Sequence, residues 1–160
     1  MADDVDEMMA SIGEAVGWGQ AGRVDEARER LTALWGRIGA DGDPLHRCSL
    51  AHYLADLQDD PAEELRWDLR ALEAAEVLTD VRAQRHHATL TVEGMRPSLH
   101  LNLAEDYRKL GRPDQAREQL ILARQHVAVL PDDEYGRMIR TGIARVAEEL
   151  GEPTVIESGS

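Results

Sequence analysis

Cys48 and His52 are the pair of residues in this sequence that is best suited to nucleophilic chemistry. A spacing of four places both on one face of a helix, where an imidazole can take the proton of a thiol. No third group that would orient the histidine can be identified. Because an unpaired cysteine is among the most frequently buried residue types, we expect Cys48 to be an inert thiol of the core.

Three glycines, Gly17, Gly19 and Gly22, have the G-x-G-x-x-G spacing of a dinucleotide-binding loop. In such a loop the glycines follow a β-strand and let the backbone approach a pyrophosphate at a helix N-terminus. The preceding residues, Met8 to Val16, lack the alternation and the β-branched content of a strand. We therefore expect Gly22 to form a turn between two helices.

Histidines His86, His87 and His100 raise the possibility of a metal site. Adjacent histidines point to different sides of a helix, and the sequence has no paired His or Cys spacing of the kind that metals require. His100 is expected to pack between helices. With no recognisable catalytic motif elsewhere, the sequence predicts no metal, no other cofactor and no enzymatic activity.

Composition and charge narrow the choice of partners. The 160 residues are 42% hydrophobic and 31% charged, which is typical of a folded globular chain. Acidic residues outnumber basic ones by 31 to 18, and a net charge of −13 repels nucleic acid and anionic membranes. An acidic N-terminal segment, the lack of a long apolar run and a single cysteine lead us to expect a cytoplasmic protein.

The segment 97–129 contains small and large apolar residues at a characteristic spacing. Small Ala104 and Ala116 allow two helices to approach closely, and larger residues fill the space between them. The full set is His100, Leu103, Ala104, Tyr107, Gly111, Pro113, Ala116 and Leu120. This set resembles the tetratricopeptide repeat, and the resemblance implies an antiparallel helix pair with its turn at Gly111.

Two earlier segments repeat this pattern. Trp18, Gly22, Ala27 and Leu31 have the same spacing as Tyr107, Gly111, Ala116 and Leu120. A looser copy covers 45–78, with Cys48, Trp67, Ala71 and Leu72 at packing positions, a helix start at Asp60-Pro61, and Glu64 at the position where the repeat has a small residue. Longer strings resemble small tetratricopeptide-repeat proteins of actinobacteria, a resemblance that implies no particular activity.

The resemblance implies an all-α fold, a right-handed antiparallel array of helix pairs (an α-α superhelix) with about seven helices. We expect one domain, 1–160, with repeats at 8–40, 45–78 and 97–129 and an insertion at 79–96 in which Gly94 breaks any helix. The apolar stripe of Ile139, Ile143, Val146 and Leu150 predicts a capping helix at 132–150, followed by a tail at 151–160.

In tetratricopeptide arrays the first helix of each pair lines a concave groove that takes extended or helical peptides. Carried over to this chain, the groove comprises His46, Ser49, Tyr53, Asp56, Ser98, Asn102, Glu105 and Lys109, with Arg137 and Arg140 at a locally basic end. Relatives that clamp a carboxylate use Lys and Asn where this chain has Ile12 and Val16, so its first repeat is expected to contact an apolar segment instead.

These observations predict a non-catalytic protein–protein interaction module, an adaptor or regulatory subunit that binds a peptide or helix of a partner. Two alternatives remain open. Helical arrays can present an unpaired apolar face, so the chain could be a self-associating structural protein. The other alternative is a small-molecule sensor or an enzyme.

Overall fold

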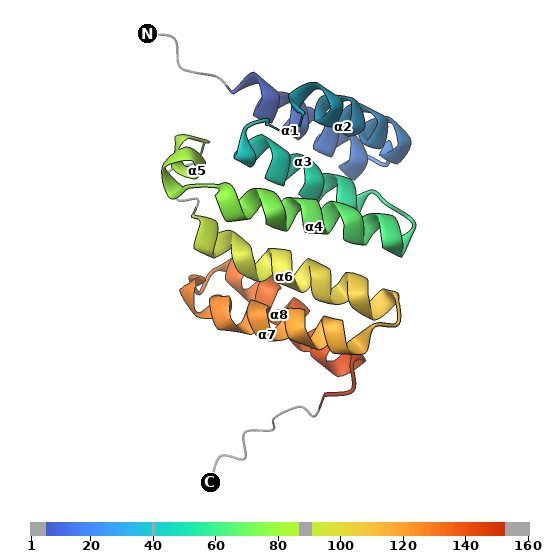
Figure 1. Cartoon of the computed structure of the whole chain (residues 1–160), viewed down its shortest axis with the longest axis vertical. Coiled ribbons are helices and arrows are strands. Elements are labelled where there is room, and N and C mark those ends of the chain that lie inside the picture. The colour runs from blue at the N-terminus through green and yellow to red at the C-terminus, as the bar shows by residue number, and fades with distance from the viewer. Residues whose placement is uncertain (1–5, 40, 87–90, 153–160) are drawn as a thin grey trace. The chain divides into compact units, whose positions relative to one another are not determined.

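The computed structural model describes residues 6–39, 41–86 and 91–152, and the regular structure within those ranges is entirely helical (Figure 1). The helices are α1 (Glu7–Gln20), α2 (Val24–Ile38), α3 (Pro44–Asp56), α4 (Pro61–Val77), α5 (Asp80–His86), α6 (Val92–Lys109), α7 (Pro113–His126) and α8 (Glu134–Glu149), with a 3-10 turn, η1 (Val127–Val129). The all-α prediction is confirmed. No described helix is long and apolar enough to cross a membrane.

The chain divides into two compact units, Met1–Val92 and Glu93–Ser160. The first unit contains α1 to α5, in which α1 packs on α2, α3 packs on α4, and α3 also contacts α1 and α2. The second unit contains α6 from Glu93 onward, α7, η1 and α8, and α8 packs on α7.

Aspartate and proline residues set the starts of α4 and α3, and the start of α4 at Asp60-Pro61 is the one that the sequence predicts. Asp60 precedes Pro61, and its carboxylate accepts a hydrogen bond from the amide of Ala62 at 3.2 Å. Asp43 and Pro44 repeat the arrangement at α3, with an acceptor distance of 2.9 Å to the amide of Leu45. Proline tolerates the first helical turn because the amides there have no partner within the helix.

Glycines in the left-handed region join the helices of two pairs. Gly22 has φ +90° and Gly111 has φ +71°, backbone angles that residues with a side chain rarely adopt. The amide after each glycine donates to an aromatic residue's carbonyl, Arg23 to Trp18 and Arg112 to Tyr107, both at 2.9 Å. The two turns are therefore built alike, and Gly22 is the inter-helix turn that the sequence predicts.

Each unit buries most of the alanine and leucine residues that the repeat pattern selects, whereas Trp18, Leu72 and Tyr107 are half-buried. Ala27 and Leu31 in the first unit, and Ala116 and Leu120 in the second, are all 0% exposed. In the second copy Trp67 is buried against Trp35, with ring centroids 5.1 Å apart in an edge-to-face arrangement. The expected stripe of α8 is also found, since Ile139, Ile143 and Val146 are buried and Leu150 is partly buried.

The segment 79–96 differs from the expected insertion. Its first part is the short helix α5, which adds one helix to the seven expected. Its last part is the beginning of α6, so Gly94 and Pro97 both lie inside a helix. The start at Val92 has a physical cause, because the carboxylate of Asp80 accepts the Val92 amide at 2.9 Å. Residues 87–90, including His87, and residues 153–160 of the tail lie outside the described residues.

Candidate functional site

A pocket of about 240 Å³ lies in the first unit, where α1, α2 and α3 meet. Helix α1 contributes Val16, Gly19 and Gln20, and α2 contributes the fully buried Leu31. Helix α3 contributes Tyr53 and Asp56, and Leu57 follows directly. The lining is thus mostly apolar, with polar groups at Gln20, Tyr53 and Asp56.

Local structure explains how these side chains come together. Gly19 has no side chain, and a Cβ there would lie 3.3 Å from Cδ2 of Leu57. The end of α1 can therefore pass close to the end of α3. Tyr53 and Asp56 are three residues apart on α3, so they share one face of that helix.

The α3 residues of the predicted groove separate into two environments. Tyr53 and Asp56 line the pocket, and Ser49 is half-buried between them and the start of the helix. His46 lies instead in a cluster of charged side chains near the N-termini of α1 and α3. Of the face that sequence spacing predicts on α3, only the C-terminal half borders the pocket.

The charged cluster joins three helices of the first unit through Arg82 of α5. Its guanidinium donates to Asp43 at 2.6 Å and to Asp6 at 3.0 Å, and Nε2 of His46 lies 2.8 Å from the same Asp6 carboxylate. Asp6 also caps α1 by accepting the amide of Met9 at 3.0 Å. This cluster ties the starts of α1 and α3 to α5.

The pKa of Asp6 falls from 3.8 to about 2 in this setting. Partial burial acts in the opposite direction, because it disfavours the charged form. Hydrogen bonds from His46, the Met9 amide and Arg82 outweigh it and stabilise the carboxylate. Asp6 is therefore ionised at neutral pH and serves as an internal partner of Arg82.

The groove residues predicted on α6 and α8 lie in the second unit. Ser98 donates to the carbonyl of Met95 at 3.1 Å, and Glu105 accepts both Nε and Nη2 of Arg108 at 3.0 and 2.7 Å. Arg108 also pairs with Glu149 at 2.8 Å. Asn102 is half-buried and Lys109 is exposed.

The two arginines expected at a basic end, Arg137 and Arg140, both have partners within the second unit. Arg140 donates to the carbonyls of Leu130, Val127 and Pro131 at 3.1, 3.4 and 3.5 Å. Arg137 is 63% exposed and lies 3.6 Å from Asp132. Arg140 thus caps the segment after α7, whereas Arg137 is a surface charge.

Ile12 and Val16, the apolar residues at the positions of the family's carboxylate clamp, have different environments. Ile12 is 1% exposed and belongs to the core, so it cannot touch a partner. Val16 is half-buried and lines the pocket. The apolar contact expected for this repeat is therefore available at Val16 alone.

Cys48, which was considered as a nucleophile, and His100, which was considered as a metal ligand, are both buried. Cys48 is 1% exposed, and burial raises the pKa of its thiol to about 12, so the thiolate that attack requires does not form at neutral pH. His100 is 5% exposed and its Nδ1 lies 2.8 Å from Oε1 of Gln119 on α7. Both residues pack in the core as the sequence predicts.

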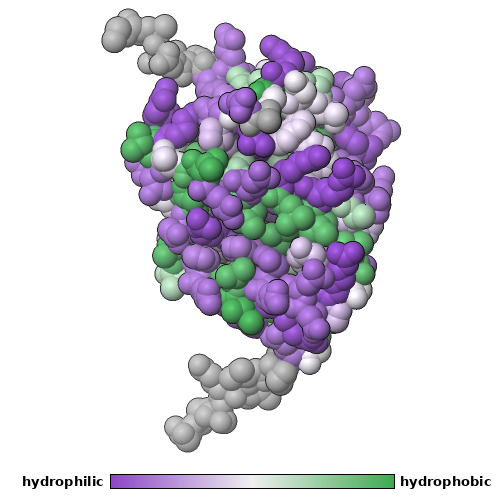
Figure 2. Space-filling view, in the orientation of Figure 1, coloured by the Kyte–Doolittle hydropathy of each residue, from purple (hydrophilic) through white to green (hydrophobic). Residues whose placement is uncertain are grey.

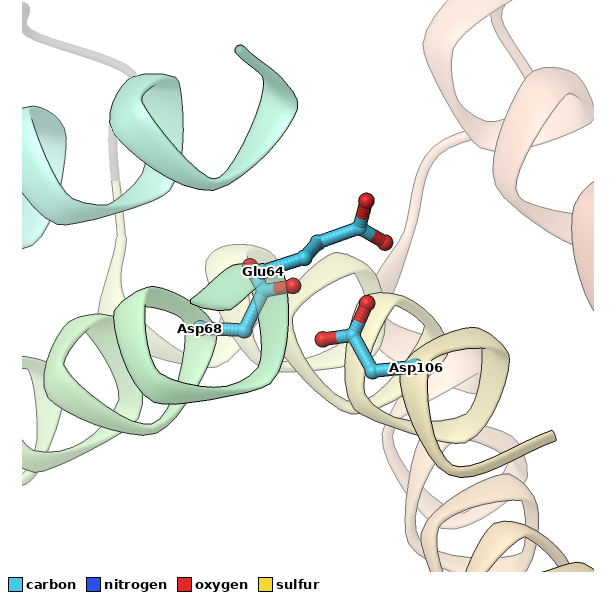
Figure 3. A group of neighbouring side chains, drawn as sticks. All are labelled: Glu64, Asp68 and Asp106. Carbon is cyan, nitrogen blue, oxygen red and sulfur yellow. The ribbon is translucent and has the colours of Figure 1, made fainter. Parts of the chain in front are cut away.

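Figure 3 shows acidic side chains, Glu64, Asp68 and Asp106, that the sequence does not mark as metal ligands. Glu64 and Asp68 lie one turn apart on α4 in the first unit, and Asp106 belongs to α6 in the second. Two carboxylates on one helix are fewer ligands than a structural metal ion takes. They define no metal centre within the first unit.

Other site residues were missed because no sequence signal marks them. Gly19, Gln20 and Leu57 line the pocket only because the ends of α1 and α3 meet. Asp6 could have been found as a helix cap, but the pairing of Arg82 with it joins residues 76 positions apart.

Comparison with known proteins supports the repeat assignment. Residues 97–120 match the family model described as tetratricopeptide repeat. They cover most of α6 and the first half of α7, so the chain contains a tetratricopeptide repeat, in its second unit. No curated protein and no solved structure matches the chain.

Proposed function

We propose that the chain is a non-catalytic protein–protein interaction module, an adaptor or regulatory subunit that binds a peptide or helix of a partner. Its contact point is the pocket between α1, α2 and α3. The observation that carries the proposal is the juxtaposition of apolar Val16 and Leu31 with the polar groups of Tyr53 and Asp56 around one cavity. Tetratricopeptide repeats in general mediate protein interactions, which agrees with this reading.

The size of the pocket favours a side chain over a cofactor. Sites for drug-sized molecules usually enclose roughly 300 to 1,000 Å³, and this pocket has about 240 Å³. A single large apolar side chain fits such a volume. Tyr53 supplies an aromatic surface with a polar end, a combination that is enriched where proteins bind one another.

Figure 2 shows hydrophilic side chains over most of the visible face of the described residues, with hydrophobic ones interspersed. In the second unit, Ser98, Asn102, Glu105 and Lys109 follow a spacing of four, three and four along α6. We propose this face as a second contact surface of the same kind.

The test is selection of binders from a displayed library of random peptides on the immobilised full chain. Retained peptides are then labelled with fluorescein, and their dissociation constants are measured by fluorescence anisotropy. Tyr53→Ala is expected to weaken binding about tenfold, because it removes an aromatic anchor beside the cavity. Circular dichroism would verify that the variant keeps its helices.

Tyr135→Ala is the matched control, since it makes the same chemical change at an exposed position of α8. Its dissociation constant should stay within about twofold of the wild-type value. Failure of every library peptide to bind, or equal loss in both variants, would contradict the proposal.

A further inference from the structure

We infer that a second surface of the first unit, formed by Trp35, Arg47 and Arg70, binds the carboxylate of an acidic segment of a partner protein. These residues belong to α2, α3 and α4, and none of them lines the pocket. Three observations on the described residues support a carboxylate here: two guanidiniums share one aromatic ring, their donors lack acceptors, and a similar arrangement elsewhere in the unit is completed by a glutamate.

Both guanidiniums lie over the same tryptophan ring. Cζ of Arg47 is 5.4 Å and Cζ of Arg70 is 5.8 Å from the ring centroid of Trp35. Arg70 also lies 4.4 Å from the ring centroid of Trp67, which packs edge-to-face against Trp35. A cation–π contact leaves in-plane N–H donors of a guanidinium available to an oxygen acceptor. The aromatic pair thus holds two cations side by side on one surface.

The donors of these two arginines lack acceptors in the part of the chain that the structure describes. Nε of Arg47 is buried there without a hydrogen-bond partner. No described carboxylate forms an ion pair with Arg47 or Arg70, and both side chains are half-buried. A guanidinium that loses water without gaining an acceptor is unfavourable. The pairing that usually offsets this loss is still open at Trp35.

Trp18 and Arg23 show how such an arrangement is completed in this unit. The guanidinium of Arg23 lies over the Trp18 ring, 4.9 Å from its centroid, and it also pairs with Glu26. Nε and Nη2 of Arg23 both donate to the same carboxylate oxygen. At Trp35 the ring and the guanidiniums are present, and the described residues supply no carboxylate. A carboxylate from a partner provides the missing group.

The residue types favour a protein segment over a free ion. Tryptophan and arginine are enriched at the energetic centres of protein interfaces. The half-buried indole of Trp35 offers an apolar surface beside the cations, which suits the methylene groups of a glutamate. Because the chain has a net charge of −13, long-range attraction does not bring an acidic partner to it. Recognition depends on direct contacts, which favours one well-placed carboxylate over a long acidic tract.

The experiment uses displayed peptides with glutamate at a fixed central position and random neighbours, selected on the immobilised full chain. Fluorescence anisotropy then gives the dissociation constants of labelled peptides for the wild type, Arg47→Gln and Arg70→Gln. Arg23→Gln is the matched control, because it removes a guanidinium that also lies over a tryptophan but already pairs with Glu26. Circular dichroism and tryptophan emission verify that each variant keeps its fold.

We expect Arg47→Gln and Arg70→Gln each to weaken binding about five- to tenfold, because each removes charge-assisted hydrogen bonds to the carboxylate. Arg23→Gln should change binding by less than about twofold. Replacing the fixed glutamate by glutamine should weaken binding to the wild type and have a much smaller effect with Arg47→Gln, since both changes remove the same interaction. Arg47→Lys should retain part of the affinity, because an ammonium keeps the charge without the planar fork.

Binding that Arg47→Gln and Arg70→Gln leave unchanged, or that Arg23→Gln weakens as much, would refute this site. If inorganic phosphate displaces the peptides with equal affinity and the same dependence on both arginines, the surface binds free oxyanions and the assignment to an acidic segment is wrong. The pocket is tested separately, because Tyr53→Ala should leave the glutamate peptides bound. The absence of any glutamate-peptide binding would overturn this inference and leave the proposal for the pocket intact.

Discussion

The first and second units of this chain share a helix-pair pattern, but they differ in how clear that pattern is and in which features accompany it. In the second unit the pattern is clearest, residues 97–120 match the family model, and the arginines Arg108 and Arg140 are engaged within the unit. In the first unit the pattern is looser, yet that unit holds the pocket and the cluster of Asp6, His46 and Arg82. The residues that define a repeat are packing residues, so the clarity of a repeat does not by itself locate a pocket.

The tryptophans make this comparison measurable. The chain has three, Trp18, Trp35 and Trp67, and all belong to the first unit. Trp67 is packed against Trp35, and the guanidinium of Arg70 lies 4.4 Å from the ring centroid of Trp67. Tryptophan fluorescence therefore reports directly on the first unit, whereas circular dichroism reports on both.

The largest effect is expected from truncating the equivalent core leucines Leu31 and Leu120. Both are 0% exposed, so replacement by alanine leaves a cavity and lowers the free energy of unfolding by about 2 to 5 kcal/mol. Leu31→Ala should shift the urea midpoint of tryptophan fluorescence more than Leu120→Ala does. Equal shifts of the urea midpoint in the two variants would contradict the prediction that tryptophan fluorescence reports on the first unit rather than on both.

A smaller and pH-dependent effect is expected at Asp6. Asp6→Asn keeps an oxygen that can cap α1 but removes the charge that pairs with Arg82 and His46. Because the folded-state pKa of Asp6 is lowered from 3.8 to about 2, its contribution to stability is fully present above about pH 4 and is lost as the pH falls toward 2. At neutral pH the variant should be less stable by on the order of 1 to 2 kcal/mol.

Urea denaturation at a series of pH values measures this difference, which should shrink below about pH 4. Asp114→Asn is the control in the second unit, because the Asp114 side chain is 98% exposed and its pair with Arg117 is a surface contact. A pH-independent difference for Asp6→Asn would contradict the electrostatic role of the cluster.

The smallest effects separate the two arginines of α8. Arg140→Ala removes hydrogen bonds to carbonyls after α7 and should cost about 1 kcal/mol of unfolding free energy. Arg137→Ala removes an exposed pair and should cost less than about 0.5 kcal/mol. Thermal unfolding followed by circular dichroism compares them, and a larger loss at Arg137 would disprove the capping role of Arg140.

The sequence by itself determined the helices and the packing positions, because both follow from local chemistry and from a helical period. Proline and aspartate begin α3 and α4, and glycine at positive φ follows α1 and α6 at Gly22 and Gly111. The alanines and leucines of the pattern are buried, with the exception of Leu72. The face shared by Tyr53 and Asp56 also follows from spacing alone.

Only the tertiary structure decided which polar residues line the pocket. His46 and Tyr53 are on one predicted face, yet His46 is bound by Asp6 and Tyr53 lines a cavity with residues of α1. Arg140 was expected at a basic surface, and its guanidinium instead meets backbone carbonyls. These outcomes depend on contacts between helix ends that lie far apart in the sequence. The spacing of residues within one helix does not predict such contacts.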